Sequence, residues 1–152
     1  MKKKTAFGFE KPEYSPGFLL WQTTVLWQRL IRKELDQHNL SHAQFVVMAS
    51  LLWFEEQGES VTQVDIISMS KLDKMTVSSS LKKLADQKLV KRSESAQDTR
   101  AKNVVLTKQG RGKVQSLVPR IEAIDEEFFG VCSLKEQKAL IQTFQKLKKE
   151  NK

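Results

Sequence analysis

Residues 62–107 decide the fold of this chain, and they read TQVDIISMSKLDKMTVSSSLKKLADQKLVKRSESAQDTRAKNVVLT. Within them, DKMTVSSSLKKLADQ places Val77, Leu81 and Leu84 on one face of a helix. The shorter segment TQVDIISMS comes before it and opens on Thr62, a candidate N-cap. Two short helices this close in sequence predict a helix-turn-helix.

A predicted hairpin follows the second helix. LVKRSES and KNVVLT are typical of two short strands, and the polar turn 96–101 joins them. Ser60 and Val61 are expected to add a small third strand. Two helices followed by a hairpin predict a winged helix-turn-helix, in which the second helix lies in the DNA major groove.

The outward face of that second helix is polar and partly basic. It carries Met75, Ser79, Lys82, Lys83 and Asp86, with Thr76 and Ser78 at its flanks. Hydroxyl groups bond to base edges or phosphates, and lysines neutralise phosphates. An ordinary solvated helix face has the same composition, so the pattern alone leaves both readings open.

Five ordered motifs run from this helix through the hairpin. They are Leu72-Asp73, Thr76-Val77, Leu89-Val90-Lys91-Arg92, Asp98 with Arg100, and Leu106-Thr107-Lys108-Gln109-Gly110. Upstream stands Leu40-Ser41-His42-Ala43-Gln44-Phe45. Together these motifs resemble the signature of the MarR family of bacterial transcriptional regulators, over about residues 18–150.

The resemblance implies a fold that is mainly α with a small β wing. The early lysines, glycines and prolines of residues 1–17 predict a flexible arm. A single regulator domain is expected over 18–152, with a DNA-binding unit at about 41–107 and dimerisation helices at about 18–38 and 110–150. The helix face and the resemblance together predict these DNA contacts: Lys74, Met75, Thr76, Ser78, Ser79, Lys82, Lys83, Asp98 and Arg100.

Two positions depart from the family pattern. Ser79 stands where the family often has an Arg, which leaves the operator sequence open. Lys88 stands where a Gly usually closes the recognition helix. A non-Gly residue in a left-handed helix end costs about 1 kcal/mol.

The charge of the chain suits a polyanionic partner. The net charge is +8, and residues 62–107 hold nine basic against five acidic side chains. A solvated basic surface is the alternative. The basic start lacks the apolar core of a signal peptide, and the longest apolar stretch, 45–54, is too short to span a bilayer. We therefore expect a cytoplasmic protein that does not contact membranes.

Apolar residues at both ends of the chain predict a dimerisation layer. Residues 18–38 are apolar over a broad arc. After the wing, a coiled-coil-like seam leads to a last helix opened by Ser133 and Glu136, a capping-box pair. The predicted interface residues are Val114, Leu117, Ile121, Ile124, Phe128, Leu140 and Phe144. A homodimer presents two recognition helices to a palindrome.

Four aromatic residues flank the expected junction between this layer and the winged unit: Trp21, Trp27, Trp53 and Phe54. In the resembled family, small aromatic effectors bind there, which makes these residues the candidate effector pocket. Core packing is the alternative for each of them.

The sequence contains few residues that suggest metal binding, catalysis or thiol chemistry. His38 and His42 are separated by a predicted helix break, so we expect no metal site and no cofactor. Two histidines and one cysteine offer few groups for catalysis, and we expect no enzyme. Cys132 is interpreted as an unreactive thiol, and a redox-responsive regulator is the alternative.

The sequence thus predicts a homodimeric DNA-binding repressor, of the stress-response kind, that a small aromatic molecule releases from its operator. The main alternative is a winged-helix module that contacts proteins and does not bind DNA.

Overall fold

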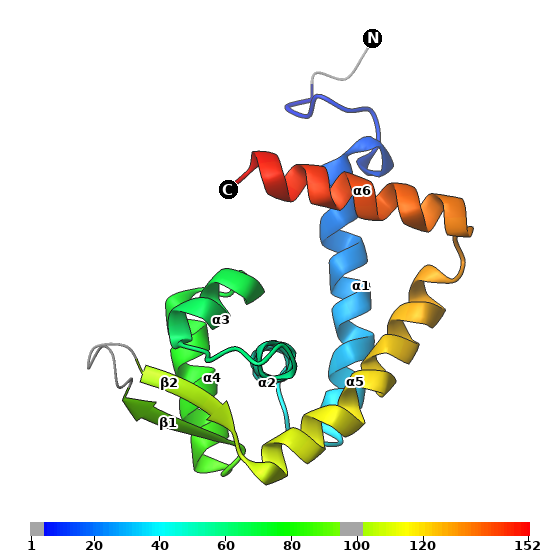
Figure 1. Cartoon of the computed structure of the whole chain (residues 1–152). Coiled ribbons are helices and arrows are strands. Elements are labelled where there is room, and N and C mark those ends of the chain that lie inside the picture. Colours follow the sequence, from blue (N-terminus) through cyan, green and yellow to red (C-terminus); the bar gives the residue numbers. More distant parts are fainter. Residues whose placement is uncertain (1–4, 95–101) are drawn as a thin grey trace. The chain divides into compact units, whose positions relative to one another are not determined.

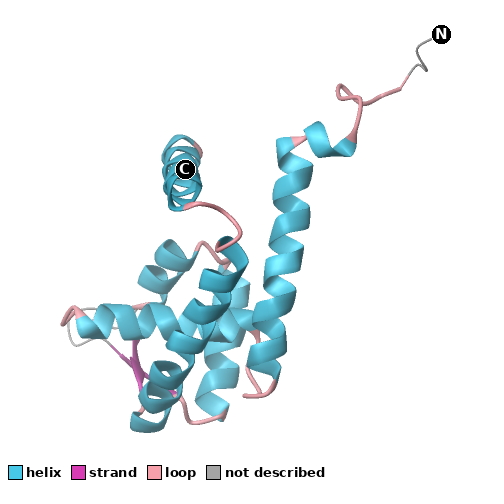
Figure 2. Ribbon diagram, turned by 90° about the vertical axis from the view of Figure 1, so that its right-hand side faces the viewer, coloured by secondary structure: helices cyan, strands magenta, loops and turns pink. Residues whose placement is uncertain are grey.

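The structure is a computed structural model that describes residues 5–94 and 102–152. They form helices and one pair of strands (Figure 1, Figure 2), in the order η1 (Pro12–Tyr14), α1 (Pro16–Asp36), α2 (His42–Glu56), α3 (Gln63–Ser70), α4 (Lys74–Asp86), β1 (Val90–Glu94), β2 (Lys102–Leu106), α5 (Lys108–Phe129) and α6 (Leu134–Glu150). The predicted class, mainly α with a small β wing, is confirmed. None of the helices in these ranges is long and apolar enough to cross a membrane.

The chain divides into two compact units, Met1–His42 and Ala43–Lys152. The first unit contains α1. This helix begins where the Phe18 N–H donates to the Ser15 hydroxyl oxygen at 3.3 Å. Beyond its end, the chain turns through Asn39, which is left-handed (φ 56°) and is the residue predicted to break the helix.

The core of the second unit is formed by one face each of α2, α3 and α4 and by the inner side of the wing. Its buried apolar residues include Val47, Met48, Leu51, Leu52, Ile66, Val77, Leu81, Leu84, Val90, Val104 and Leu106. Burying one such side chain fully contributes about 1.5–3 kcal/mol. The predicted inner face of α4 is confirmed, since Val77, Leu81 and Leu84 are all 0% exposed.

The wing is a two-stranded antiparallel hairpin whose register runs from Val90↔Leu106 to Glu94↔Lys102. The expected third strand at Ser60 and Val61 is wrong. In the described part of the chain there is only an isolated bridge, Thr62↔Asn103, beside a hydrogen bond from the Val104 N–H to the Val61 carbonyl (2.8 Å).

The physical reason is the start of α3. Thr62 caps this helix, as predicted, in a capping box with Asp65: the Thr62 N–H donates to the Asp65 carboxylate at 2.8 Å. The Thr62 N–H is therefore bonded to Asp65 and is not available to a strand ladder, and the chain enters α3 directly after this residue, so the pairing is limited to one bridge.

The end of α4 is closed by Lys88, which is left-handed with φ 59°. The Leu89 N–H donates to the Leu84 carbonyl and the Lys88 N–H to the Ala85 carbonyl, both at 2.9 Å. This pair of bonds is a Schellman motif. Lys88 therefore adopts the conformation that Gly usually supplies.

The start of α5 explains the Leu-Thr-x-x-Gly motif. The Thr107 hydroxyl accepts from the Gly110 N–H (3.0 Å) and donates to the Lys88 carbonyl (2.7 Å). Gly110 packs directly on the backbone of Leu89: a Cβ on Gly110 would clash with the Leu89 carbonyl oxygen and lie 2.8 Å from its carbon. The position has no room for a side chain.

We predict that Gly110→Ala lowers the free energy of unfolding by at least about 1–3 kcal/mol, because backbone must move to admit the methyl group. The matched control is Gly112→Ala on the same helix, where an added Cβ meets nothing within 4 Å. It should be neutral or stabilise by up to about 1 kcal/mol. Urea unfolding followed by circular dichroism measures both, and equal stabilities for the two variants would contradict the prediction.

The start of α4 is capped by Asp73. Its carboxylate accepts from the Thr76 hydroxyl at 2.6 Å and from the Thr76 N–H at 2.8 Å. The hydroxyl bond first, and then the amide bond, lower the pKa of Asp73 below its ordinary value. Both bonds favour the charged carboxylate.

A lowered pKa in the folded state means that the Asp73 contribution to stability is present above the unfolded pKa. It is lost as the pH falls through the folded value. We predict that Asp73→Asn, which keeps an acceptor but does not titrate, loses less stability than the parent between about pH 5 and pH 2. Urea titrations across this range measure the difference, and parallel pH profiles would count against it.

Candidate nucleic-acid interface

The outward face of α4 carries the predicted set of polar and basic side chains. Lys74, Ser79, Lys82 and Lys83 are exposed, and Thr76 and Ser78 are half-buried at its edges. Met75, in the first turn, is 82% exposed. The buried leucines and valine on the opposite face fix this orientation.

Hydrogen bonds within α4 decide what its hydroxyl groups offer. The Thr76 hydroxyl donates to Asp73, and the Ser79 hydroxyl donates to the Thr76 carbonyl (3.3 Å). A hydroxyl whose proton is engaged in this way presents acceptor lone pairs outward. Amino groups of adenine and cytosine are the donors that such acceptors meet in a major groove.

One side chain of the wing forms a hydrogen bond with the backbone of α4. Arg92, on β1, donates through Nη2 to the carbonyl of Ser78 at 3.1 Å. The sequence pointed to Arg92 only as part of the Leu-Val-x-Arg motif. Its partner is a backbone atom, which no residue pattern reveals. Asp98 and Arg100 lie outside the described residues.

The four aromatic residues of the predicted effector pocket are divided between the two units. On α1, Trp21 is 66% exposed and Trp27 is half-buried, with its ring 5.3 Å from that of His42. On α2, Trp53 is 56% exposed and Phe54 is half-buried. A pocket that all four share stays a prediction.

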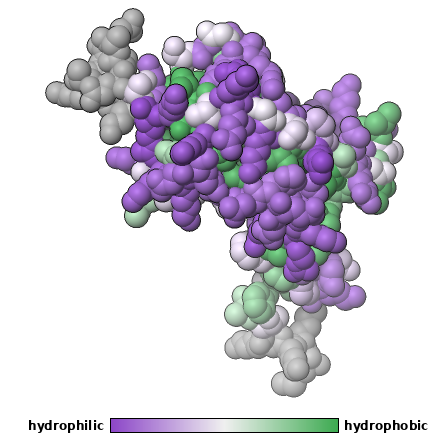
Figure 3. Space-filling model, turned by 90° about the horizontal axis from the view of Figure 1, so that it is seen from below, coloured by the Kyte–Doolittle hydropathy of each residue, from purple (hydrophilic) through white to green (hydrophobic). Residues whose placement is uncertain are grey.

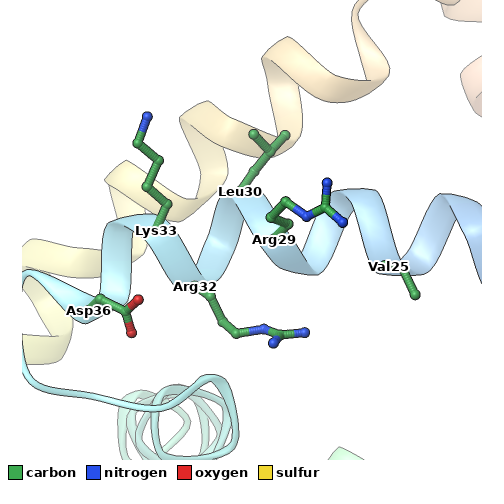
Figure 4. Close-up of a pocket in the computed structure, with 6 residues that line it drawn as sticks. All are labelled: Val25, Arg29, Leu30, Arg32, Lys33 and Asp36. Carbon is green, nitrogen blue, oxygen red and sulfur yellow. The ribbon is translucent and has the colours of Figure 1, made fainter.

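Two hollows follow α1. One, of about 340 Å³, is lined by Trp21, Gln22, Val25 and Leu26, and the other, of about 610 Å³, by Val25, Arg29, Leu30, Arg32, Lys33 and Asp36. Figure 4 shows Arg32 and Lys33 pointing to opposite sides of the helix. The cations of the larger hollow therefore do not converge on a single anion.

The predicted interface residues differ in exposure. Val114 and Leu117 are 0% exposed in one chain and Ile121 is 7% exposed, so they belong to the core and have almost no surface for a partner. Ile124, Phe128 and Leu140 are half-buried, and Phe144 is 40% exposed. The interface assignment stays a prediction and now rests on these last four.

More apolar surface surrounds them. α6 buries none of its residues, and Leu134, Ile141 and Leu147 on it are at least half exposed. Figure 3 shows apolar patches among a mainly hydrophilic surface on the face seen from below.

Among the residues that the structure describes, no three His, Cys, Asp or Glu side chains are grouped to hold a metal ion. Cys132 is half-buried.

Sequence comparisons agree with this geometry. A family model described as an ArnR1-like winged-helix domain matches residues 36–124. The chain is 40% identical over 128 residues to the HTH-type transcriptional regulator YdcH of Bacillus subtilis strain 168, covering 84% of this chain and 87% of YdcH. It is 29% identical over 129 residues to the transcriptional regulator HosA of Escherichia coli O157:H7, covering 85% and 88%.

Solved structures show the same fold. BpsR of Bordetella bronchiseptica, whose DNA binding is regulated by 6-hydroxynicotinic acid, superposes with a TM-score of 0.83 at 28% identity, over 93% of this chain and 98% of BpsR. MepR of S. aureus, in complex with DNA, gives 0.81 at 23% identity, over 90% and 98%. These relatives are regulators and not enzymes, as expected from the sequence. The chain belongs to the ArnR1-like winged-helix family of HTH-type transcriptional regulators, and it has the fold of MarR family regulators, such as the one from Silicibacter pomeroyi (TM-score 0.76, 22% identity, over 93% of both chains).

Proposed function

We propose that this protein binds palindromic duplex DNA as a homodimer and represses transcription until a small molecule releases it. The observation that carries the proposal is the outward face of α4, with acceptor hydroxyls in its first turns and exposed lysines further along. A helix with this order reads bases with its first turns and holds phosphates with the lysines behind them.

Within this arrangement each residue has a separate role. Thr76, Ser78 and Ser79 face base edges, and the exposed thioether of Met75 suits contact with a thymine methyl group. Lys74, Lys82 and Lys83 contact phosphates. The lysines set the affinity for any duplex, whereas the hydroxyls select the sequence.

Dimerisation and release are supported by other features. The exposed apolar side chains of α6 and of the start of α1 need a cover, and a second copy of the chain supplies one. BpsR, whose DNA binding is regulated by 6-hydroxynicotinic acid, supports a small aromatic effector. Such a ligand weakens DNA binding only if it binds better to the dimer that does not fit the operator.

One observation favours the alternative, a module that contacts proteins. Val64 is 71% exposed and Met69 44% exposed on α3, close in sequence to Met75 on α4. Exposed apolar residues on a helix-turn-helix suit a protein surface as well as a groove. A redox-responsive regulator that uses Cys132 has less support, because that thiol is half-buried.

The first test uses the lysines of α4. Lys82→Ala and Lys83→Ala should each weaken binding to all duplex sequences alike and reduce the slope of log affinity against log salt by about one. Lys149→Ala, an exposed lysine near the end of α6, is the control and should leave the slope unchanged. Fluorescence anisotropy over a salt series measures these slopes. If all three variants behave like the parent, α4 does not lie on DNA.

The second test concerns the wing tip, where the resemblance places Arg100 in a minor groove. Arg100→Ala should cost about 1–3 kcal/mol of operator affinity and leave the thermal midpoint nearly unchanged. Arg100→Lys should restore binding only in part, because an ammonium group lacks the planar fork of a guanidinium. Asp98→Ala should cost less than Arg100→Ala. Parent-like binding by Arg100→Ala would mean that this arginine does not contact the operator.

A further inference from the structure

The outer edge of β2 is held by two different groups. A strand at the edge of a sheet exposes backbone N–H groups that need partners. The Val104 N–H donates to the Val61 carbonyl at 2.8 Å, an ordinary backbone bond. The Leu106 N–H donates instead to a side chain, Oε1 of Glu55, at 2.9 Å. A carboxylate from α2 therefore holds the last residue of the wing.

The same carboxylate has a second partner. Its Oε2 forms an ion pair with Nη2 of Arg111 at 2.6 Å, and Arg111 lies in the first turns of α5. The Glu55 side chain is only 12% exposed, whereas that of Arg111 is 44% exposed. A carboxylate so far removed from water needs compensation for its charge, and Arg111 provides it by proximity, although the pair is not aligned as a hydrogen bond. Glu55 thus joins three elements: α2, β2 and α5.

The other strand of the wing is tied to the recognition helix. Arg92 on β1 donates to the Ser78 carbonyl on α4. The hairpin is therefore fixed along both edges, by Arg92 on one strand and by Glu55 on the other. Figure 1 shows that β2 leads straight into α5, so the Glu55 contact lies at the root of the wing.

We propose that Glu55 is a positioning residue for DNA recognition that acts through β2 and does not itself touch DNA. The proposal rests on the function proposed above. Two elements that bind one duplex together gain affinity only when their spacing matches the DNA, and flexibility between them reduces that gain. Glu55 removes this flexibility at the root of the wing.

The direction of the change in DNA affinity distinguishes a positioning role from a purely electrostatic effect of Glu55. Removing a carboxylate from a DNA-binding protein should strengthen binding, because DNA is a polyanion. A positioning role predicts the opposite for Glu55. Glu56, the next residue of α2, is an exposed carboxylate and gives a control with the same change of charge and size.

The experiment compares Glu55→Ala, Glu55→Gln and Glu56→Ala on a duplex selected by the parent protein from a random-sequence library. Glu55→Ala should weaken binding by at least about tenfold and lower the salt slope, because Arg100 on the wing no longer engages the duplex together with α4. If Glu55→Ala were only partly folded, a stoichiometric titration would show a smaller active fraction. The slope of log affinity against log salt would then equal that of the parent. Glu55→Gln keeps an acceptor for Leu106 and should fall between the parent and Glu55→Ala. Glu56→Ala should bind as well as the parent or better.

Amide hydrogen exchange without DNA tests the contact itself. The Leu106 amide should exchange at least about tenfold faster in Glu55→Ala, because a hydrogen bond to a charged group is lost. The Val104 amide, bonded to backbone, is the internal reference.

Unchanged Leu106 exchange, or DNA binding by Glu55→Ala equal to that of Glu56→Ala, overturns the positioning role. A parent protein that binds no duplex overturns the proposed function and this role together, even where Leu106 exchange changes as expected.

Discussion

The backbone of Leu89 is the point on which the winged unit depends. Its N–H closes α4 by donating to the Leu84 carbonyl, and its own carbonyl accepts from the Thr107 N–H at 3.0 Å. Gly110 packs against the same carbonyl, and the Leu89 side chain is 2% exposed. The end of α4, both strands and the start of α5 are therefore joined through one residue. Any change in their relative placement has to break several bonds there at once.

This junction explains how a short hairpin can work beside a recognition helix. The buried Val77, Leu81 and Leu84 fix the rotation of α4 about its own axis, and the Leu89 junction fixes where the wing leaves it. An isolated two-stranded hairpin is marginal in water. The wing is stable because α4, α2 and α5 supply the contacts that a larger sheet would otherwise provide.

Patterns local in sequence predicted the structure well, and contacts between distant residues escaped them. Helical periodicity identified the inner face of α4 because burial imposes that period. Thr62 was found as a cap from its residue type, and Ser133 from its spacing of three residues to Glu136. Glu55 was missed because it binds a backbone amide 51 residues away. The seam on α5 was found, but an apolar period does not tell whether the same chain or a partner covers it, and Val114 proved to be covered within one chain.

The two left-handed lysines at the ends of α3 and α4, Lys71 and Lys88, have a consequence for which substitutions these positions tolerate. A side chain in this conformation costs about 1 kcal/mol, whereas a cation beside the carbonyl end of a helix returns about 0.3–1 kcal/mol. The two terms nearly cancel. Exchange between lysine and glycine at Lys88 is therefore expected to change the free energy of unfolding very little. Gly110, in contrast, packs against the Leu89 carbonyl and does not tolerate a side chain.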